Sequence, residues 1–271
     1  MEAVSALQRL GKQIIIISNS SRRRSDTAAR LQRMGFAFDA TDVVTSGDLV
    51  FAGLSAGTDA VFKDLGPRCF VFGNGDDDEE YVRACGKVTA PTEEADFILA
   101  RGLFSVLGAG PAAPYSAEAE AKALAASLSR VEGGIPMLVA NPDETRPDGA
   151  DSPMPGQLAR RYEQQGAADV RRVGKPHPLI YEACRAQMAG HGTGQRIVAV
   201  GDSLHHDVLG AARNGIDAVF CCAGVHADEL GVPQARGDVE PEPERLRALL
   251  DRFADETGGC APTHVLAGFR M

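Results

Sequence analysis

One lysine and two aspartates in the C-terminal half of the chain have the types and spacing of a phosphate-handling site. Lys175 precedes a helix-length segment, and Asp202 and Asp207 follow the apolar run 197–200. A short apolar run of this kind is typical of a strand buried on both faces of a parallel sheet, and ligands bind beyond the carboxyl ends of such strands. A cation and two carboxylates in one crevice could hold a phosphate group and a bridging metal ion.

A second polar cluster follows a predicted strand near the N-terminus. The run 14–17 consists of four isoleucines, whose β-branched side chains favour a strand, and Ser18 and Asn19 come directly after it. A strand that ends in hydroxyl and amide residues at a helix start can bind an anion through backbone N–H groups. The alternative is that Ser20 or Ser21 only caps the next helix.

The elements that must position these residues alternate between strands and helices along the chain. This alternation predicts an α/β fold with parallel sheets. Besides the runs above, the predicted strands are 68–72, 95–100, 136–140 and 216–221. The predicted helices are 1–12, 28–34, 49–54, 117–128, 157–165, 178–188 and 244–254.

Composition excludes several classes of protein. The 271 residues include 44% hydrophobic side chains, enough for a sizeable core, and the net charge of −9 argues against nucleic acid or an anionic membrane as a partner. No apolar run approaches the ~20 residues of a transmembrane helix, and the N-terminus lacks a secretory signal pattern. The six cysteines form no C-x-x-C pair, which indicates a reducing compartment without disulfides or structural zinc. We therefore expect a cytoplasmic protein.

Three further motifs are weaker candidates for sites. The stretch 108–113 is similar to a dinucleotide-binding turn, but two prolines delay the helix that should follow, so we interpret it as a loop. The acidic run 76–80 could bind a cation, although such runs are usually solvated. His205 and His206 are adjacent and point apart on a helix, which favours the surface or the rim of a site over a shared metal ion.

The ordered motifs resemble a known family. The segments 14–19, 174–176 and 200–207 are similar to motifs II, III and IV of the haloacid dehalogenase (HAD) superfamily. The long segment between motifs II and III resembles the C2-type cap of subfamily IIA, the group of NagD-like and 4-nitrophenylphosphatase-like enzymes. Within it, 45–48 and 140–143 are also similar to stretches of that subfamily.

The resemblance implies a fold and a division into domains. The fold would be a HAD-type core, with a Rossmann-like parallel sheet, and an inserted α/β cap of the C2 type. The core would comprise residues 1–21 and 173–271, and the cap residues 22–172. A homodimer formed through the cap is a further expectation from the subfamily.

The resemblance also implies roles for the polar residues. Ser18 would hydrogen-bond the phosphoryl group with help from the backbone N–H of Asn19, and Lys175 would neutralise the phosphate. Asp202 would be a direct Mg²⁺ ligand, and Asp207 a ligand or a partner of one. The implied reaction is Mg²⁺-dependent hydrolysis of a small phosphorylated metabolite. Ser18, Lys175 and Asp202 would be the catalytic residues.

Motif I of the family, a strand that ends in Asp-x-Asp-Gly and carries the nucleophile, is not found before the run 14–17. Asp76 and Asp78 form an Asp-x-Asp pair, but in the segment assigned to the cap. Either the recorded start is downstream of the true one, in which case an organelle signal could also precede Met1, or the chain is inactive. We favour the first explanation, because motifs II to IV keep reactive residue types. The alternative function is a non-catalytic protein that binds a phosphorylated ligand or a partner.

Overall fold

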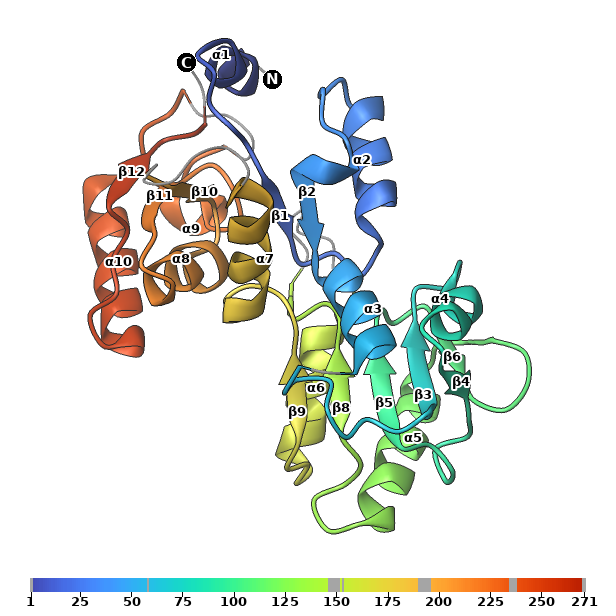
Figure 1. Ribbon diagram of the computed structural model, residues 1–271. Coiled ribbons are helices and arrows are strands. Elements are labelled where there is room, and N and C mark those ends of the chain that lie inside the picture. Colours follow the sequence, from blue (N-terminus) through green and yellow to red (C-terminus); the bar gives the residue numbers. More distant parts are fainter. Residues whose placement is uncertain are drawn as a thin grey trace.

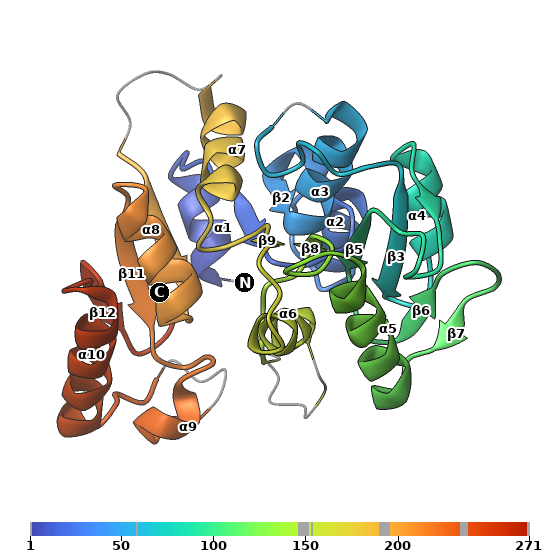
Figure 2. The same ribbon diagram turned by 90° about the horizontal axis from the view of Figure 1, so that it is seen from below.

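The computed structural model describes residues 2–57, 59–145, 152, 154–189, 196–233 and 238–269. The elements form two lobes, which Figures 1 and 2 show from two directions. We call the described residues of 2–45 and 174–269 the core lobe and those of 46–173 the cap lobe. No described helix combines the length and the apolar character needed to cross a membrane.

The core lobe contains two separate parallel sheets. In the first, β1 (Ile16–Ser18) pairs with β2 (Val43–Thr45). In the second, β10 (Val198–Gly201), β11 (Asp217–Cys221) and β12 (His264–Leu266) lie in that order. Among the described residues, no strand pairs with the free edge of β1 or with that of β10.

Helix α7 (Pro178–Met188) packs against both parts of the core lobe. Ile180 is buried in a cluster with Val44 of β2, against which Ile17 of β1 also packs. On the other side, the Tyr181 hydroxyl lies so close to Gly210 that a Cβ there would be 2.1 Å away. Figure 1 shows α7 between the two sheets. The helix thereby holds the two sheets in one lobe.

The remaining core helices surround these sheets. They are α1 (Glu2–Arg9), α2 (Arg24–Arg33), α8 (Leu209–Arg213), α9 (Ala227–Leu230) and α10 (Pro243–Thr257), with a 3₁₀ turn at Ala40–Asp42 and a π-helical turn at Leu204–Val208. Apolar side chains of the π-helical turn, α8, β11, α9 and α10 share one buried cluster. Cys222 is completely buried in that cluster.

The cap lobe is built on one seven-stranded sheet of order β7–β6–β3–β5–β8–β9, with β4 paired to β3. Its strands are β3 (Arg68–Gly73), β4 (Val88–Thr89), β5 (Phe97–Ala100), β6 (Ser105–Leu107), β7 (Ala113–Pro114), β8 (Met137–Val139) and β9 (Val170–Arg172). Its helices are α3 (Ser46–Ala56), α4 (Asp78–Ala84), α5 (Ala117–Arg130) and α6 (Pro155–Gln164). β6 runs antiparallel to β3, so the sheet is mixed around a parallel centre. Every residue of β5 and β8 is buried.

The predicted α/β class with a parallel-dominated sheet is confirmed. The predicted boundary between core and cap after residue 21 stays a prediction, but the pairing of β2 with β1 supports a different position. We propose that the cap begins near Ser46, where α3 starts. The alternative role of Ser20 or Ser21 as a helix cap is wrong, because α2 begins after Arg23 without a side-chain cap.

Candidate active site

Lys175 and Asp207 form the centre of a polar site between the two core sheets. The Lys175 Nζ lies 2.6 Å from Asp207 Oδ1, and both side chains are largely enclosed. Lys175 follows Gly174, whose φ of +130° is unfavourable for other residues. A Cβ at Gly174 would lie 2.4 Å from the Ser46 hydroxyl, so the backbone before the lysine packs tightly against the start of the cap lobe.

Asp207 is held by backbone groups at the end of β10. Its Oδ2 accepts hydrogen bonds from the N–H groups of Asp202, at 3.1 Å, and Ser203, at 3.0 Å. A Cβ at Gly201 would lie 2.2 Å from the Asp207 carboxyl carbon, so only glycine permits this approach. Asp207 lies in the π-helical turn, a local distortion that is frequent at functional sites.

Asp202 lies at the same strand end but faces the loop after β11. Its Oδ2 accepts a hydrogen bond from the N–H of Val225 at 2.9 Å. A Cβ at Gly224 would lie 2.0 Å from the same oxygen, which explains the glycine there. The sequence therefore brings Asp202 and Asp207 to one edge of the sheet.

Asn19 connects the end of β1 to the lysine loop. Its side chain is 4% exposed; Oδ1 accepts a hydrogen bond from the Lys175 N–H at 2.6 Å, and Nδ2 donates to the Lys175 carbonyl at 3.3 Å. The Ser18 hydroxyl accepts a hydrogen bond from the N–H of Ser20 at 3.2 Å. The prediction assigned Asn19 a role through its backbone, whereas the side chain makes the contacts that reach Lys175.

Two residues that the sequence analysis did not assign to the site also lie there. Asp143, in the loop after β8 of the cap lobe, accepts a hydrogen bond on Oδ1 from Asn19 Nδ2 at 2.8 Å. The same oxygen lies 3.4 Å from His206 Nδ1. Asp143 comes three residues after the end of the predicted strand 136–140, and this position near a strand end was the signal available in the sequence.

Electrostatics favours the charged form of Lys175. Burial lowers the pKa of a lysine, but the attraction of Asp207, the hydrogen bond to it and the charges of Asp143 and Asp202 together raise the pKa of Lys175. For His206, burial is the largest effect and lowers the pKa, against the attraction of Asp143. The site therefore holds a charged Lys175 ammonium group close to the side chains of Asp143, Asp202 and Asp207.

Two family models match opposite ends of the chain. The model described as haloacid dehalogenase-like hydrolase matches residues 1–87, and the HAD-hydrolase-like model matches residues 172–255, so that together they cover more than half of the sequence. The chain belongs to the haloacid dehalogenase-like hydrolases. By resemblance it is a phosphohydrolase of this superfamily.

Individual HAD proteins support the same relationship. The chain is 28% identical to mouse chronophin over 232 residues, which cover 84% of this chain and 75% of chronophin. A haloacid dehalogenase-like hydrolase from Brucella suis is 27% identical, with a TM-score of 0.66 over 98% of this chain and 88% of that one. A glycerol phosphate phosphatase from Mycobacterium tuberculosis, in complex with magnesium, has a TM-score of 0.62 at 22% identity over 98% of this chain and 69% of that one, and shows the shared fold.

The donor chemistry of the site is compatible with the Mg²⁺ ion that HAD enzymes generally use. Mg²⁺ prefers carboxylate and phosphate oxygens and keeps several water ligands, so one or two protein carboxylates suffice. Asp202 and Asp207 supply such oxygens, although Asp207 already accepts bonds on both of them. Within the described part of the chain, no group of three or more His, Cys, Asp or Glu side chains has the arrangement of a metal site.

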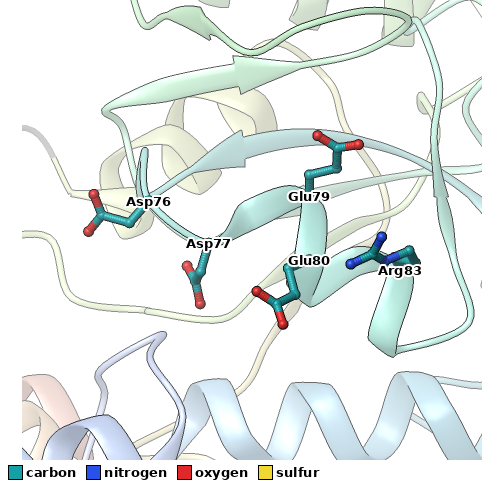
Figure 3. Close-up of a pocket in the computed structure, with 5 residues that line it drawn as sticks. All are labelled: Asp76, Asp77, Glu79, Glu80 and Arg83. Carbon is teal, nitrogen blue, oxygen red and sulfur yellow. The ribbon is translucent and has the colours of Figure 1, made fainter.

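The acidic run 76–80 of the cap lobe is only partly solvated, which corrects the expectation of a solvated surface. Asp76, Asp77, Glu79, Glu80 and Arg83 line a surface pocket (Figure 3). Asp78, in contrast, is 4% exposed and lies 2.6 Å from Arg101, which is completely buried. The cluster therefore contains a structural ion pair, and its exposed members have no further observation that indicates a ligand.

The other two weak motifs are the turn at 108–113 and the pair His205 and His206. The turn at 108–113 connects β6 to β7, and the next helix starts only at Ala117, so no helix N-terminus faces it. His205 is exposed and lies 3.0 Å from Glu256, whereas His206 is half-buried and faces Asp143. The two histidines thus point to different partners, as their adjacent positions predicted.

Proposed function

We propose that this HAD protein hydrolyses a small phosphomonoester with the help of Mg²⁺ at the site around Lys175. The observation that carries the proposal is the convergence of Lys175, in the loop after β9, with Asp202 and Asp207, which follow the carboxyl end of β10. Phosphoryl transfer requires mainly positioning and neutralisation of charge, which a lysine and a hard cation provide. As part of the same proposal, the protein is a member of subfamily IIA and forms a homodimer through its cap.

Each residue has a distinct part in this proposal. Lys175 binds a phosphate oxygen and neutralises its charge, in exchange for part of its contact with Asp207. The Ser18 hydroxyl donates a hydrogen bond to a second phosphate oxygen. Mg²⁺, held by Asp202 and Asp207, would neutralise further charge on the phosphate. The magnesium complex of the Mycobacterium tuberculosis glycerol phosphate phosphatase supports the choice of ion.

A second candidate function is the binding of a phosphorylated ligand without hydrolysis. It is favoured by Asp207, whose two carboxylate oxygens both accept hydrogen bonds, one from Lys175 and the other from two backbone N–H groups. A carboxylate with both oxygens engaged is a poor nucleophile toward phosphorus. Lys175 and Ser18 would then bind the phosphate group in the same way.

Replacement of Asp202 tests the proposal. With 4-nitrophenyl phosphate as the probe, we expect Mg²⁺-dependent phosphate release by the wild-type protein and release at background level by Asp202→Asn. Asp228→Asn is the matched control, because Asp228 is exposed in the same lobe and should leave turnover unchanged. Full turnover by Asp202→Asn would contradict the proposed metal role. Thermal stabilisation by phosphate and Mg²⁺ without release by the wild type would establish the second candidate.

A further inference from the structure

Asp143 enters the site from the cap lobe, while its hydrogen-bond partner Asn19 and the lysine belong to the core lobe. We propose that Asp143 is a positioning residue, which holds Lys175 in place by fixing the orientation of the Asn19 amide. The inference deepens the proposed function, because it describes how the cap lobe prepares the lysine for a phosphate group.

The loop that carries Asp143 is tightly fixed. The Asp143 N–H donates to Asn141 Oδ1 at 3.0 Å, and its carbonyl accepts a hydrogen bond from the Gly156 N–H at 3.0 Å. A Cβ at Gly156 would lie 2.3 Å from the Pro142 carbonyl oxygen, so α6 packs directly on the loop. A carboxylate on such a support has a defined position relative to the cap sheet.

Asp143 selects one of the two orientations of the Asn19 amide. An ionised carboxylate only accepts hydrogen bonds, so the amide nitrogen of Asn19, and not its oxygen, must face Asp143. The opposite end of the amide, Oδ1, then faces Lys175 and accepts its N–H at 2.6 Å. The terminal torsion of asparagine is otherwise free to turn, so both orientations of the amide are accessible. In the reversed orientation, the Nδ2 group of Asn19 would face the N–H of Lys175, and two donors would oppose each other.

The contact continues from the lysine backbone to its charged end. Asn19 bonds both the N–H and the carbonyl of Lys175, which fixes the backbone from which the side chain extends to Asp207. Asn19 is 4% exposed, so water does not readily replace these bonds. The position of Asp143 is thereby coupled, through Asn19, to the position of the Lys175 ammonium group.

The backbone amide of Lys175 provides a direct readout that needs no activity. The chain has five lysines, so labelling with ¹⁵N-lysine gives five backbone amide signals, and the Lys175 signal is the one that Lys175→Arg removes. In Asp143→Ala we expect this signal to move upfield, as its hydrogen bond to Asn19 weakens, while the other four stay in place. Glu144→Ala is the matched control, because Glu144 is the next residue and its carboxylate pairs with Arg160 on the surface.

Phosphate affinity gives the second readout. With inorganic phosphate and Mg²⁺ in calorimetry, we expect Asp143→Ala to weaken binding about tenfold, Asp143→Asn to weaken it less because an acceptor oxygen remains, and Glu144→Ala to leave it unchanged. Asn19→Ala should weaken phosphate binding as much as Asp143→Ala. The double variant should bind no more weakly than either single variant, because both changes break the same connection between Asp143 and Lys175.

Specific outcomes would overturn the inference. An unmoved Lys175 amide signal in folded Asp143→Ala would do so, as would an equal loss of affinity in Glu144→Ala or losses that add in the double variant. If Asp143→Ala does not fold, the Lys175 signal of Asp143→Asn decides the question in the same way. Because the amide signal is measured without phosphate, a wild type that binds no phosphate would contradict the proposed function alone.

Discussion

The two lobes differ in how completely their sheets are covered. In the cap lobe, β5 and β8 are buried along their whole length inside a continuous sheet. In the core lobe, the valines of β10, Val198 and Val200, are 45% and 42% exposed, although parallel strands are usually buried on both faces. The residues of the proposed site lie at the ends of the less covered strands. The cap lobe is therefore expected to provide rigidity, and the core lobe to provide access.

Each lobe also contains a buried cation–carboxylate pair, and the two pairs have different surroundings. Arg101 of the cap lobe is completely enclosed, stacks over the Tyr81 ring at 3.7 Å and contacts Asp78 at 2.6 Å. Asp78 also accepts hydrogen bonds from two backbone N–H groups and a serine hydroxyl. The Lys175–Asp207 pair remains 15% and 11% exposed, whereas Arg101 is completely buried. Similar chemistry thus serves structure in the cap lobe and, in the proposed function, phosphate binding in the core lobe.

The largest expected effect separates these two ion pairs. Arg101→Met leaves Asp78 buried without its cation, and we expect a loss of about 3–5 kcal/mol in the free energy of unfolding. Lys175→Met should cost only about 1–3 kcal/mol, because Asp207 keeps its two backbone donors, but it should abolish phosphate binding. Urea unfolding and calorimetry with phosphate measure the two quantities. Equal stability losses in both variants would remove the distinction between the lobes.

The next effect compares apolar side chains of the two sheets. Leu138 of β8 is completely buried, so Leu138→Ala should lower the free energy of unfolding by about 2–5 kcal/mol. Val200→Ala is the counterpart in β10 and should change it by less than about 0.5 kcal/mol. The comparison uses urea midpoints of the two variants. A large loss in Val200→Ala would show that this face of β10 is covered in solution.

The smallest effect concerns mild acid. All six histidines follow Gly174, so the cap lobe has none. Burial is the main cause that lowers the pKa of His226 below 6.5, which means that its neutral form is favoured in the folded protein. This contribution to stability is complete above pH 6.5 and is lost as the pH falls through that value toward the lowered pKa.

We therefore expect the urea concentration at the unfolding midpoint to be lower at pH 5 than at pH 7.5. In His226→Gln the difference between the midpoints at the two pH values should be slightly smaller. Hydrogen exchange should place the loss in the core lobe, after correction for the intrinsic pH dependence of exchange. A loss of protection centred on β5 or β8 would contradict this assignment.

The long elements could be predicted from the sequence because their signals are local. Helix α7 has the predicted bounds 178–188, and the strand at 197–200 is found as β10 one residue later. The short strands β2 and β12 have three residues each, too few for a periodic pattern, and they form because β1 and β11 lie beside them. Pairing of this kind depends on tertiary contacts that no local window contains.

The site shows the same limit. The positions of Asp202 and Asp207 followed from the strand before them, whereas the Asn19–Asp143 bond joins residues 124 positions apart. Asp78 lies in an acidic run typical of a solvated surface, and only the fold shows that Arg101 neutralises it. Sequence reasoning thus identified site residues next to the strand ends of the core lobe, and it missed Asp143, which follows a strand of the cap lobe and reaches the site only through the fold.

The separate sheets of the core lobe have a consequence for handling the protein. Among the described residues, no strand pairs with the outer edge of β1 or of β10, and the exposed valines Val198 and Val200 belong to one of these two strands. Strand edges without a partner favour edge-to-edge association between molecules. We therefore expect charged substitutions at Val198 and Val200 to lower the tendency of this sequence to associate at high concentration.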